Sequence, residues 1–90
     1  MLGIRRKPDE SRMDYDVDFA RLIPADDRVI SMETRADEGI ELASSQLFGN
    51  VVKVWLAGGT ARKTYTVTVL ATTQQGRIVE ECFKIRVTEC

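Results

Sequence analysis

The fold is decided by the stretch Val51–Thr73, which reads Val-Val-Lys-Val-Trp-Leu-Ala-Gly-Gly-Thr-Ala-Arg-Lys-Thr-Tyr-Thr-Val-Thr-Val-Leu-Ala-Thr-Thr. In its second half, apolar side chains alternate with threonines. The apolar members are Tyr65, Val67, Val69 and Ala71. A period of two with β-branched residues on the outer side is typical of a half-buried β-strand. The stretch therefore predicts two β-strands joined at the corner Gly58–Gly59.

The corner itself resembles the E–F corner of immunoglobulin-like and fibronectin-type sandwiches, through Leu56, Gly59 and Tyr65. In that corner a tyrosine opens a central strand, and its hydroxyl bonds back to the backbone upstream. We expect Tyr65 in this role and Gly58 and Gly59 in the turn. If Tyr65 faces the core, its hydroxyl should anchor the start of the second strand.

Five further strands are expected outside this stretch. Asp14–Phe19 alternates cleanly, with Tyr15, Val17 and Phe19 inward and three aspartates outward, as suits a sheet edge. The other segments are Arg28–Thr34 with the core pair Ile30 and Met32, Ile40–Ala43, a brief strand at Gln46–Phe48, and Arg77–Thr88 after the turn Gln74–Gly76.

The last of these strands has an irregular inner face. Phe83, Ile85 and Val87 continue one apolar side, but Val79 and Glu81 lie on the same side. We expect a bulge or a water-facing strand end there. Short strands separated by frequent turns predict an all-β fold, an antiparallel immunoglobulin/fibronectin-III-like β-sandwich of about seven short strands, as one domain over residues 13–90.

Residues 1–12 are expected to form an extended N-terminal arm, because Pro8 lacks a donor and the neighbouring polar run has nothing to bury. The arm is either a disordered tail or a segment that orders on a neighbouring subunit. In the second case Arg5, Arg6 and Lys7 are candidate contacts. Net charge is +2 over residues 1–13, −6 over 14–42 and +3 over 43–90. This distribution of charge has two interpretations. It helps copies, or different subunits, to dock in one orientation, or it is an ordinary solvated surface of mixed charge.

Size and charge exclude several classes of protein. The chain has 90 residues, and no apolar run approaches the ~20 residues of a membrane span. The polar N-terminus has no signal-peptide apolar region, so synthesis and initial retention in the cytosol are expected. A net charge of −1 provides no basic field for nucleic acid.

The composition offers little for catalysis or cofactor binding. There is no histidine, which removes the usual acid–base residue and most zinc sites. Cys82 and Cys90 lie too far apart on one strand for a disulfide. The Asp14-x-Asp16-x-Asp18 pattern lacks the glycine and glutamate of a calcium loop. We expect no enzyme, no cofactor and no metal.

Two apolar residues break the expected pattern on the outer faces. If Val52, Val54 and Leu56 face the core, Trp55 faces outward, and Leu70 interrupts the outward threonines. Exposed tryptophan beside exposed leucine predicts a binding patch. A shift of one residue in register would instead bury Trp55 in the core.

Three blocks of the chain resemble a family of small tailed-bacteriophage virion proteins, the fiber–tail adaptors. The blocks are Asp14-Tyr-Asp-Val-Asp-Phe19, Val54-Trp-Leu-Ala-Gly-Gly59, and Tyr65-Thr-Val-Thr-Val69 with Thr72-Thr73-Gln-Gln-Gly-Arg77. The chain departs from the family pattern at Lys7-Pro8-Asp9, which lacks a first aspartate, at Phe19, where tryptophan is common, and at Ala57, which replaces serine.

The resemblance implies a structural role without catalytic residues. Such a protein is a component of the virion neck or tail, assembled in the host bacterial cytoplasm, that anchors fibers or spikes through repeated weak contacts in an oligomeric ring. Its partners would be phage tail or neck proteins and fiber or spike proteins. Two alternatives stay open, namely a stand-alone immunoglobulin-like module for carbohydrate or protein ligands and a small regulatory protein of prophage origin.

Overall fold

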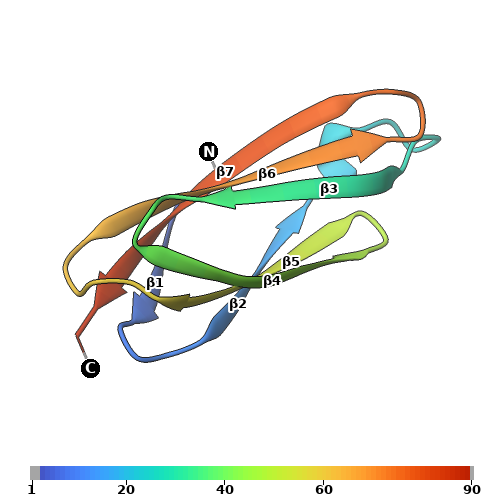
Figure 1. The fold of residues 1–90 in the computed structure, drawn as a ribbon. Coiled ribbons are helices and arrows are strands. Elements are labelled where there is room, and N and C mark those ends of the chain that lie inside the picture. Colours follow the sequence, from blue (N-terminus) through green and yellow to red (C-terminus); the bar gives the residue numbers. More distant parts are fainter. Residues whose placement is uncertain (1–2, 90) are drawn as a thin grey trace.

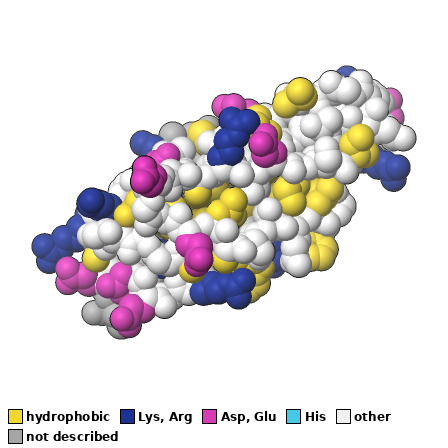
Figure 2. Space-filling view, viewed as in Figure 1, with side chains coloured by type: hydrophobic (Ala, Val, Ile, Leu, Met, Phe, Trp, Pro, Cys, Tyr) yellow, Lys and Arg dark blue, Asp and Glu magenta, His cyan; other side chains and the backbone are white. Residues whose placement is uncertain are grey.

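The chain folds into two stacked β-sheets (Figure 1), in a computed structural model that describes residues 3–89. The elements are β1 (Ile4–Pro8), β2 (Met13–Asp18), the short 3-10 helix η1 (Ala20–Leu22), β3 (Val29–Ala36), β4 (Ile40–Phe48), β5 (Val51–Gly58), β6 (Thr64–Thr73) and β7 (Ile78–Thr88). One sheet has the order β1-β7-β6-β3 and the other β2-β5-β4. The predicted all-β class is confirmed. The body is elongated, 44 × 20 × 18 Å (Figure 2).

The N-terminal segment is part of the larger sheet. β1 runs parallel to β7, with Ile4 opposite Lys84 and Pro8 opposite Thr88, whereas all other strand pairs are antiparallel. Tyr15 of the opposite sheet donates its hydroxyl proton to the carbonyl oxygen of Arg6 at 2.9 Å. Residues 4–8 therefore form an edge strand of this sheet and not a free arm. The edge of β7 offers unpaired backbone groups, and β1 satisfies them.

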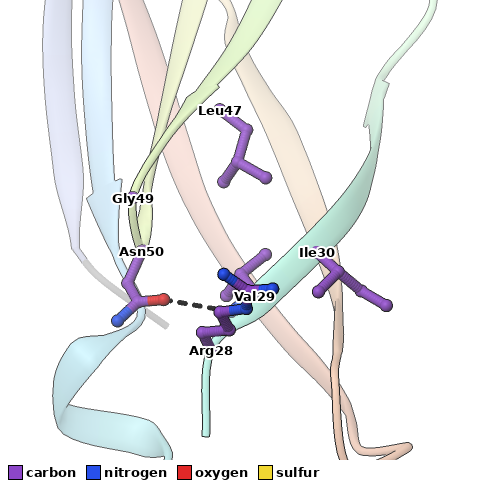
Figure 3. Close-up of a pocket in the computed structure, with 6 residues that line it drawn as sticks. All are labelled: Arg28, Val29, Ile30, Leu47, Gly49 and Asn50. Carbon is purple, nitrogen blue, oxygen red and sulfur yellow. Dashed lines mark hydrogen bonds between the residues drawn. The ribbon is translucent and has the colours of Figure 1, made fainter.

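A β-bulge at the start of β3 overturns one predicted core residue. The pairing with β6 shifts between Val29 and Ser31, which leaves Ile30 as the extra residue. Val29 is buried, while Ile30 is 53% exposed and points away from Leu47 (Figure 3). Met32 is half-buried against the core, but Ile30 as its core partner was wrong. The extra residue changes which side chain faces inward.

The strand after β3 is longer than predicted. Instead of a short strand and a brief second one, β4 is continuous from Ile40 to Phe48. A bulge between Leu42 and Ser44 absorbs the break in its apolar pattern. β4 pairs along the whole of β5, and this tertiary pairing holds the Ala43–Ser45 segment in the sheet although its sequence resembles a loop.

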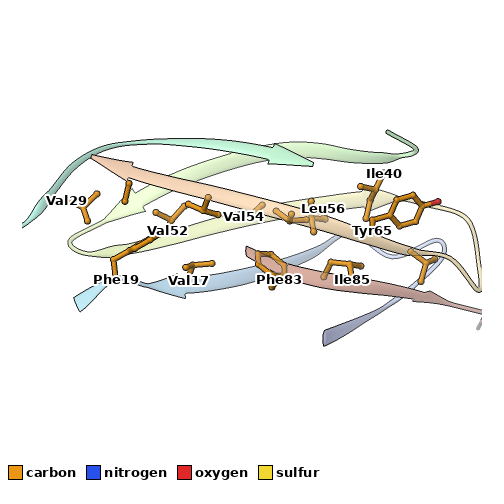
Figure 4. Close-up of a cluster of buried hydrophobic side chains, with 14 of the residues drawn as sticks. Val17, Phe19, Val29, Ile40, Val52, Val54, Leu56, Tyr65, Phe83 and Ile85 are labelled. Atoms are coloured by element: carbon orange, nitrogen blue, oxygen red, sulfur yellow. The ribbon is translucent and has the colours of Figure 1, made fainter. Parts of the chain in front are cut away.

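The core lies between the inner faces of the two sheets (Figure 4). β5 contributes Val52, Val54 and Leu56, and all three are fully buried. The alternation predicted for β5, β6 and β7 is confirmed, because every second residue of these strands is inward. Other fully or almost fully buried members are Val17, Phe19, Val67, Val69, Ala71, Phe83, Ile85 and Val87. Each large apolar side chain contributes about 1.5–3 kcal/mol by leaving water.

The start of β7 differs from one of the two expectations for it. Its pairing with β6 is regular from Thr72–Ile78 to Thr64–Arg86, so no bulge occurs. Val79 and Glu81 are half-buried, so this end of the strand is only partly open to water. One carboxylate oxygen of Glu81, Oε2, is buried and has no hydrogen-bond partner among the described residues.

Candidate interaction surfaces

Trp55 and Leu70 lie on the outward faces of different sheets. Trp55 alternates with the buried residues of β5, and Leu70 stands between the buried Val69 and Ala71 of β6. Because the two sheets face each other through the core, these outward faces are on opposite sides of the molecule. The single Trp55/Leu70 patch suggested by the sequence does not exist, and each residue belongs to a surface of its own.

The surface around Trp55 combines an aromatic ring with charges. Trp55 is half-buried, and the guanidinium carbon of Arg12 lies 5.1 Å from the centroid of its ring. The ammonium of Lys53 lies 3.0 Å from Asp14 and 3.6 Å from Asp16. The hydrogen bond to Asp14 raises the pKa of Lys53, and the same bond lowers the pKa of Asp14. Two of the aspartates considered for calcium are thus paired with a lysine.

Among residues 3–89 no three histidine, cysteine, aspartate or glutamate side chains are grouped as metal ligands. Cys82 is a free thiol on the outer face of β7, and Cys90 lies outside the described residues.

The three N-terminal cations have different environments. Arg5 and Arg6 are exposed, but Lys7 is fully buried. The Nζ of Lys7 donates to the carbonyl oxygens of Gly58 at 2.7 Å, Pro8 at 2.8 Å and Asp9 at 3.3 Å. Burial lowers the pKa of Lys7, against the raising effect of Asp9. Lys7 therefore joins β1 to the end of β5 inside the protein and is not available for the surface contact expected of it.

The corner residues meet at the same end of the molecule as Lys7. The hydroxyl of Tyr65 accepts a hydrogen bond from the backbone N–H of Thr60 at 2.9 Å. Gly59 has φ of +92°, and a Cβ there would lie 2.7 Å from Cγ2 of Val87. Both the backbone conformation and the space exclude a side chain at this position. Leu56 is fully buried beneath the corner, and Gly58 provides a carbonyl to Lys7.

Sequence reasoning missed a buried carboxylate at the opposite end. Oδ1 of Asp27 accepts from the backbone N–H groups of Arg28 and Gln75, and Oδ2 accepts from Arg77 at 2.7 Å. Burial alone would raise the pKa of Asp27, but the hydrogen bonds from Thr73, Arg77 and the two N–H groups outweigh it and lower the pKa to about 2. Asp27 and Arg77 are 50 positions apart, so no local pattern announces the pair.

Two surface hollows accompany these features. An open pocket of about 470 Å³ lies between the start of β3 and the β4–β5 turn, where Oδ1 of Asn50 accepts from the N–H of Val29 (Figure 3). Its lining residues are Arg28, Val29, Ile30, Leu47, Gly49 and Asn50. A second hollow of about 270 Å³ is lined by Arg5, Asp16, Asp18, Arg21, Leu22 and Glu81. In the view of Figure 2, hydrophobic side chains lie interspersed with charged ones.

A protein-family model matches residues 7–86, and its description is Podophage GP4 fiber-tail adaptor protein gp77. The chain belongs to this family. The match begins at Lys7 and extends into β7, so it includes the corner, the Trp55 surface and the Asp27–Arg77 pair. The resemblance carried by the three sequence blocks is therefore confirmed. No curated protein matches the chain. Within residues 3–89, no helix of this fiber-tail adaptor family member has the length and apolarity to cross a membrane.

Proposed function

We propose that this protein is a non-enzymatic structural adaptor of a phage or prophage virion, which links fibers or spikes to the neck or tail through protein–protein contacts. The observation that carries the proposal is the fiber-tail adaptor family match over residues 7–86. The polar side chains that pair within the fold support it. Lys7, Asp27 and the Lys53–Asp14 pair are all occupied in joining segments of the chain to one another.

The architecture proposed for this adaptor is an immunoglobulin-like β-sandwich forming one domain. Two features favour it, namely the four- and three-stranded sheets with β1 parallel to the last strand, and the tyrosine hydroxyl bound to backbone at the β5–β6 corner. Residues 4–8 then belong to the domain as an edge strand. A rigid domain with two broad outer faces suits a part that must hold two partners at a set distance.

The proposed partners would bind on surfaces whose side chains are not already used by the fold. The candidates for contacts with tail or fiber proteins are Trp55 on the outer face of β5, Arg12 beside its ring, and the exposed Arg5 and Arg6 on β1. Tryptophan and arginine are the residue types that most often contribute large binding energies at interfaces. Copies arranged in a ring by the symmetry of the particle would multiply modest affinities into a durable joint.

Gold labelling of intact phage particles with an antibody to this domain tests the proposal, with blotting of dissociated particles as a control for buried epitopes. Label at the collar or tail, together with a band in the blot, is the expected result. Intact particles without label and dissociated particles without a band would overturn it. Binding of the isolated domain to a glycan array then tests the alternative that this protein is a stand-alone carbohydrate-binding module.

A further inference from the structure

The outward face of the sheet β1-β7-β6-β3 has a regular order of residues along the strands. Opposite one another on β7 and β6 lie the outward pairs Ile78–Thr72, Glu80–Leu70, Cys82–Thr68, Lys84–Thr66 and Arg86–Thr64. We call these ten residues the threonine face. Its pairing is regular over this whole length, so Cys82 and Thr68 mark its middle.

Charges on the threonine face are separated by sign about this middle. On one side Leu70 stands between Glu80 on β7 and Glu33 on β3. On the other side lies Lys84, followed by Arg86, with Arg6 of β1 beside it. Among the described residues, neither Glu80 nor Lys84 takes part in an ion pair. The face therefore presents one acidic and one basic half, and Glu80 and Lys84 are free to pair with charges of another molecule.

We propose that the threonine face binds the threonine face of a second copy of this chain. The two copies are related by a two-fold axis that lies between the faces, runs perpendicular to the strands and crosses them at the level of Cys82 and Thr68. This rotation reverses the strand direction and places each strand over its own counterpart. Glu80 then faces Lys84 of the second copy twice, and Leu70 faces Thr66 of the second copy. The proposal deepens the proposed function, since it names one contact between copies in the assembled adaptor.

Charge complementarity selects this arrangement and this occupant. A two-fold axis parallel to the strands, midway between β7 and β6, would instead place β7 over β6 of the second copy and set Glu80 against Leu70, which forms no ion pair. The sequence order Glu-x-Cys-x-Lys on β7 is complementary to itself when antiparallel. At the middle level Arg35 of β3 would approach Arg35 of the second copy, but Glu33 already pairs with Arg35 at 3.0 Å and offsets its charge.

Charge reversal tests the contact in solution with the isolated chain, by sedimentation equilibrium. The wild type should dimerise with a Kd below about 1 mM. Glu80→Lys alone and Lys84→Glu alone should each weaken the dimer at least about tenfold, because both symmetric ion pairs become repulsive. An equimolar mixture of the two variants, and the double variant in one chain, should recover the wild-type affinity. A monomeric wild type, or single variants that dimerise as well as the wild type, would overturn the proposal.

The middle of the contact is tested by a short bismaleimide in a Cys90→Ser background. Facing sheets pack about 10 Å apart, too far for a disulfide but close enough for such a reagent to join the two Cys82 thiols. The matched control is Thr64→Cys with Cys82→Ser, because position 64 lies four residues from the axis and its two copies would be about 26 Å apart. Cross-linking of the control but not of Cys82 would show that the axis is wrong.

Neither experiment uses a virion component. A monomeric chain whose antibody labels phage tails would remove this inference and leave the proposed function standing. A chain that dimerises through this face in solution but is absent from phage particles would leave the contact between copies standing and remove the proposed adaptor function.

Discussion

The two ends of the stacked sheets are closed by different chemistry. At one end the β5–β6 corner is joined to β1 and β7. Lys7 of β1 donates to the carbonyl of Gly58, the Tyr65 hydroxyl accepts from the backbone of the corner, and Gly59, which has a positive φ, packs closely against β7. At the other end the Asp27 carboxylate joins the segment before β3 to the β6–β7 turn. The hydrogen bonds of the first closure go to backbone groups, whereas those of the second depend on a carboxylate. They should therefore respond differently to substitution and to acid.

The largest effect is expected from Tyr65→Ala at the corner. Loss of the buried ring and of the bond to Thr60 should lower the free energy of unfolding by about 3–5 kcal/mol, since a cavity remains beside Gly59. Tyr65→Phe, which removes only the hydroxyl, should cost about 1 kcal/mol. Urea denaturation of the three proteins measures both values. Equal stability of Tyr65→Ala and the wild type would contradict the role given to the corner.

A smaller loss is expected from Lys7→Met at the same end. Methionine keeps the length of the side chain but leaves the carbonyls of Gly58 and Pro8 without this donor, at roughly 1–3 kcal/mol in the free energy of unfolding. Arg6→Met, at the exposed neighbouring position, is the matched control and should change stability by less than about 0.5 kcal/mol. If both variants unfold at the same denaturant concentration, Lys7 has no special part in closing this end.

The opposite end should weaken in acid. The pKa of Asp27 in the folded protein is about 2, below the ordinary value of 3.8, so the folded state favours the charged form. Its contribution is complete above about pH 4 and is lost as the pH falls towards 2. Thermal unfolding followed between pH 6 and pH 2 should show this decline, and Asp27→Asn should be less stable at pH 6 and show a shallower decline. Parallel pH curves for the two proteins would exclude Asp27 as the acid-sensitive group.

The smallest effect on stability is expected between the two ends, at Trp55. Its ring faces outward beside Arg12, so Trp55→Ala should change the free energy of unfolding by less than about 1 kcal/mol. Binding to tail or fiber proteins should nevertheless be lost if this surface is a partner contact. Phe48→Ala, at an exposed apolar position that belongs to none of the proposed contacts, is the matched control in the same pull-down. Retained binding by a folded Trp55→Ala variant would remove Trp55 from the proposed contacts.

The strands that the sequence predicted well are those with an unbroken period of two. β5, β6 and the second half of β7 alternate between apolar and polar side chains, and their inward residues are buried in the structure. Ile30 was misplaced because a bulge is set by pairing with β6 and not by the local pattern. Lys7 was assigned to the surface because lysine is rarely buried, and its three carbonyl partners are not visible in a local reading.

By itself the sequence determined the all-β class, the inward faces of the central strands, the turns and the membership of a fiber-tail adaptor family, because these follow from side-chain period, glycine positions and motifs along the chain. Tertiary structure alone decided that residues 4–8 pair with β7, that Trp55 and Leu70 lie on opposite faces, and that Asp27 meets Arg77. The physical reason is distance along the chain. Local preferences specify a strand, but its neighbours and the charges it faces depend on segments that meet only after the sheets have stacked.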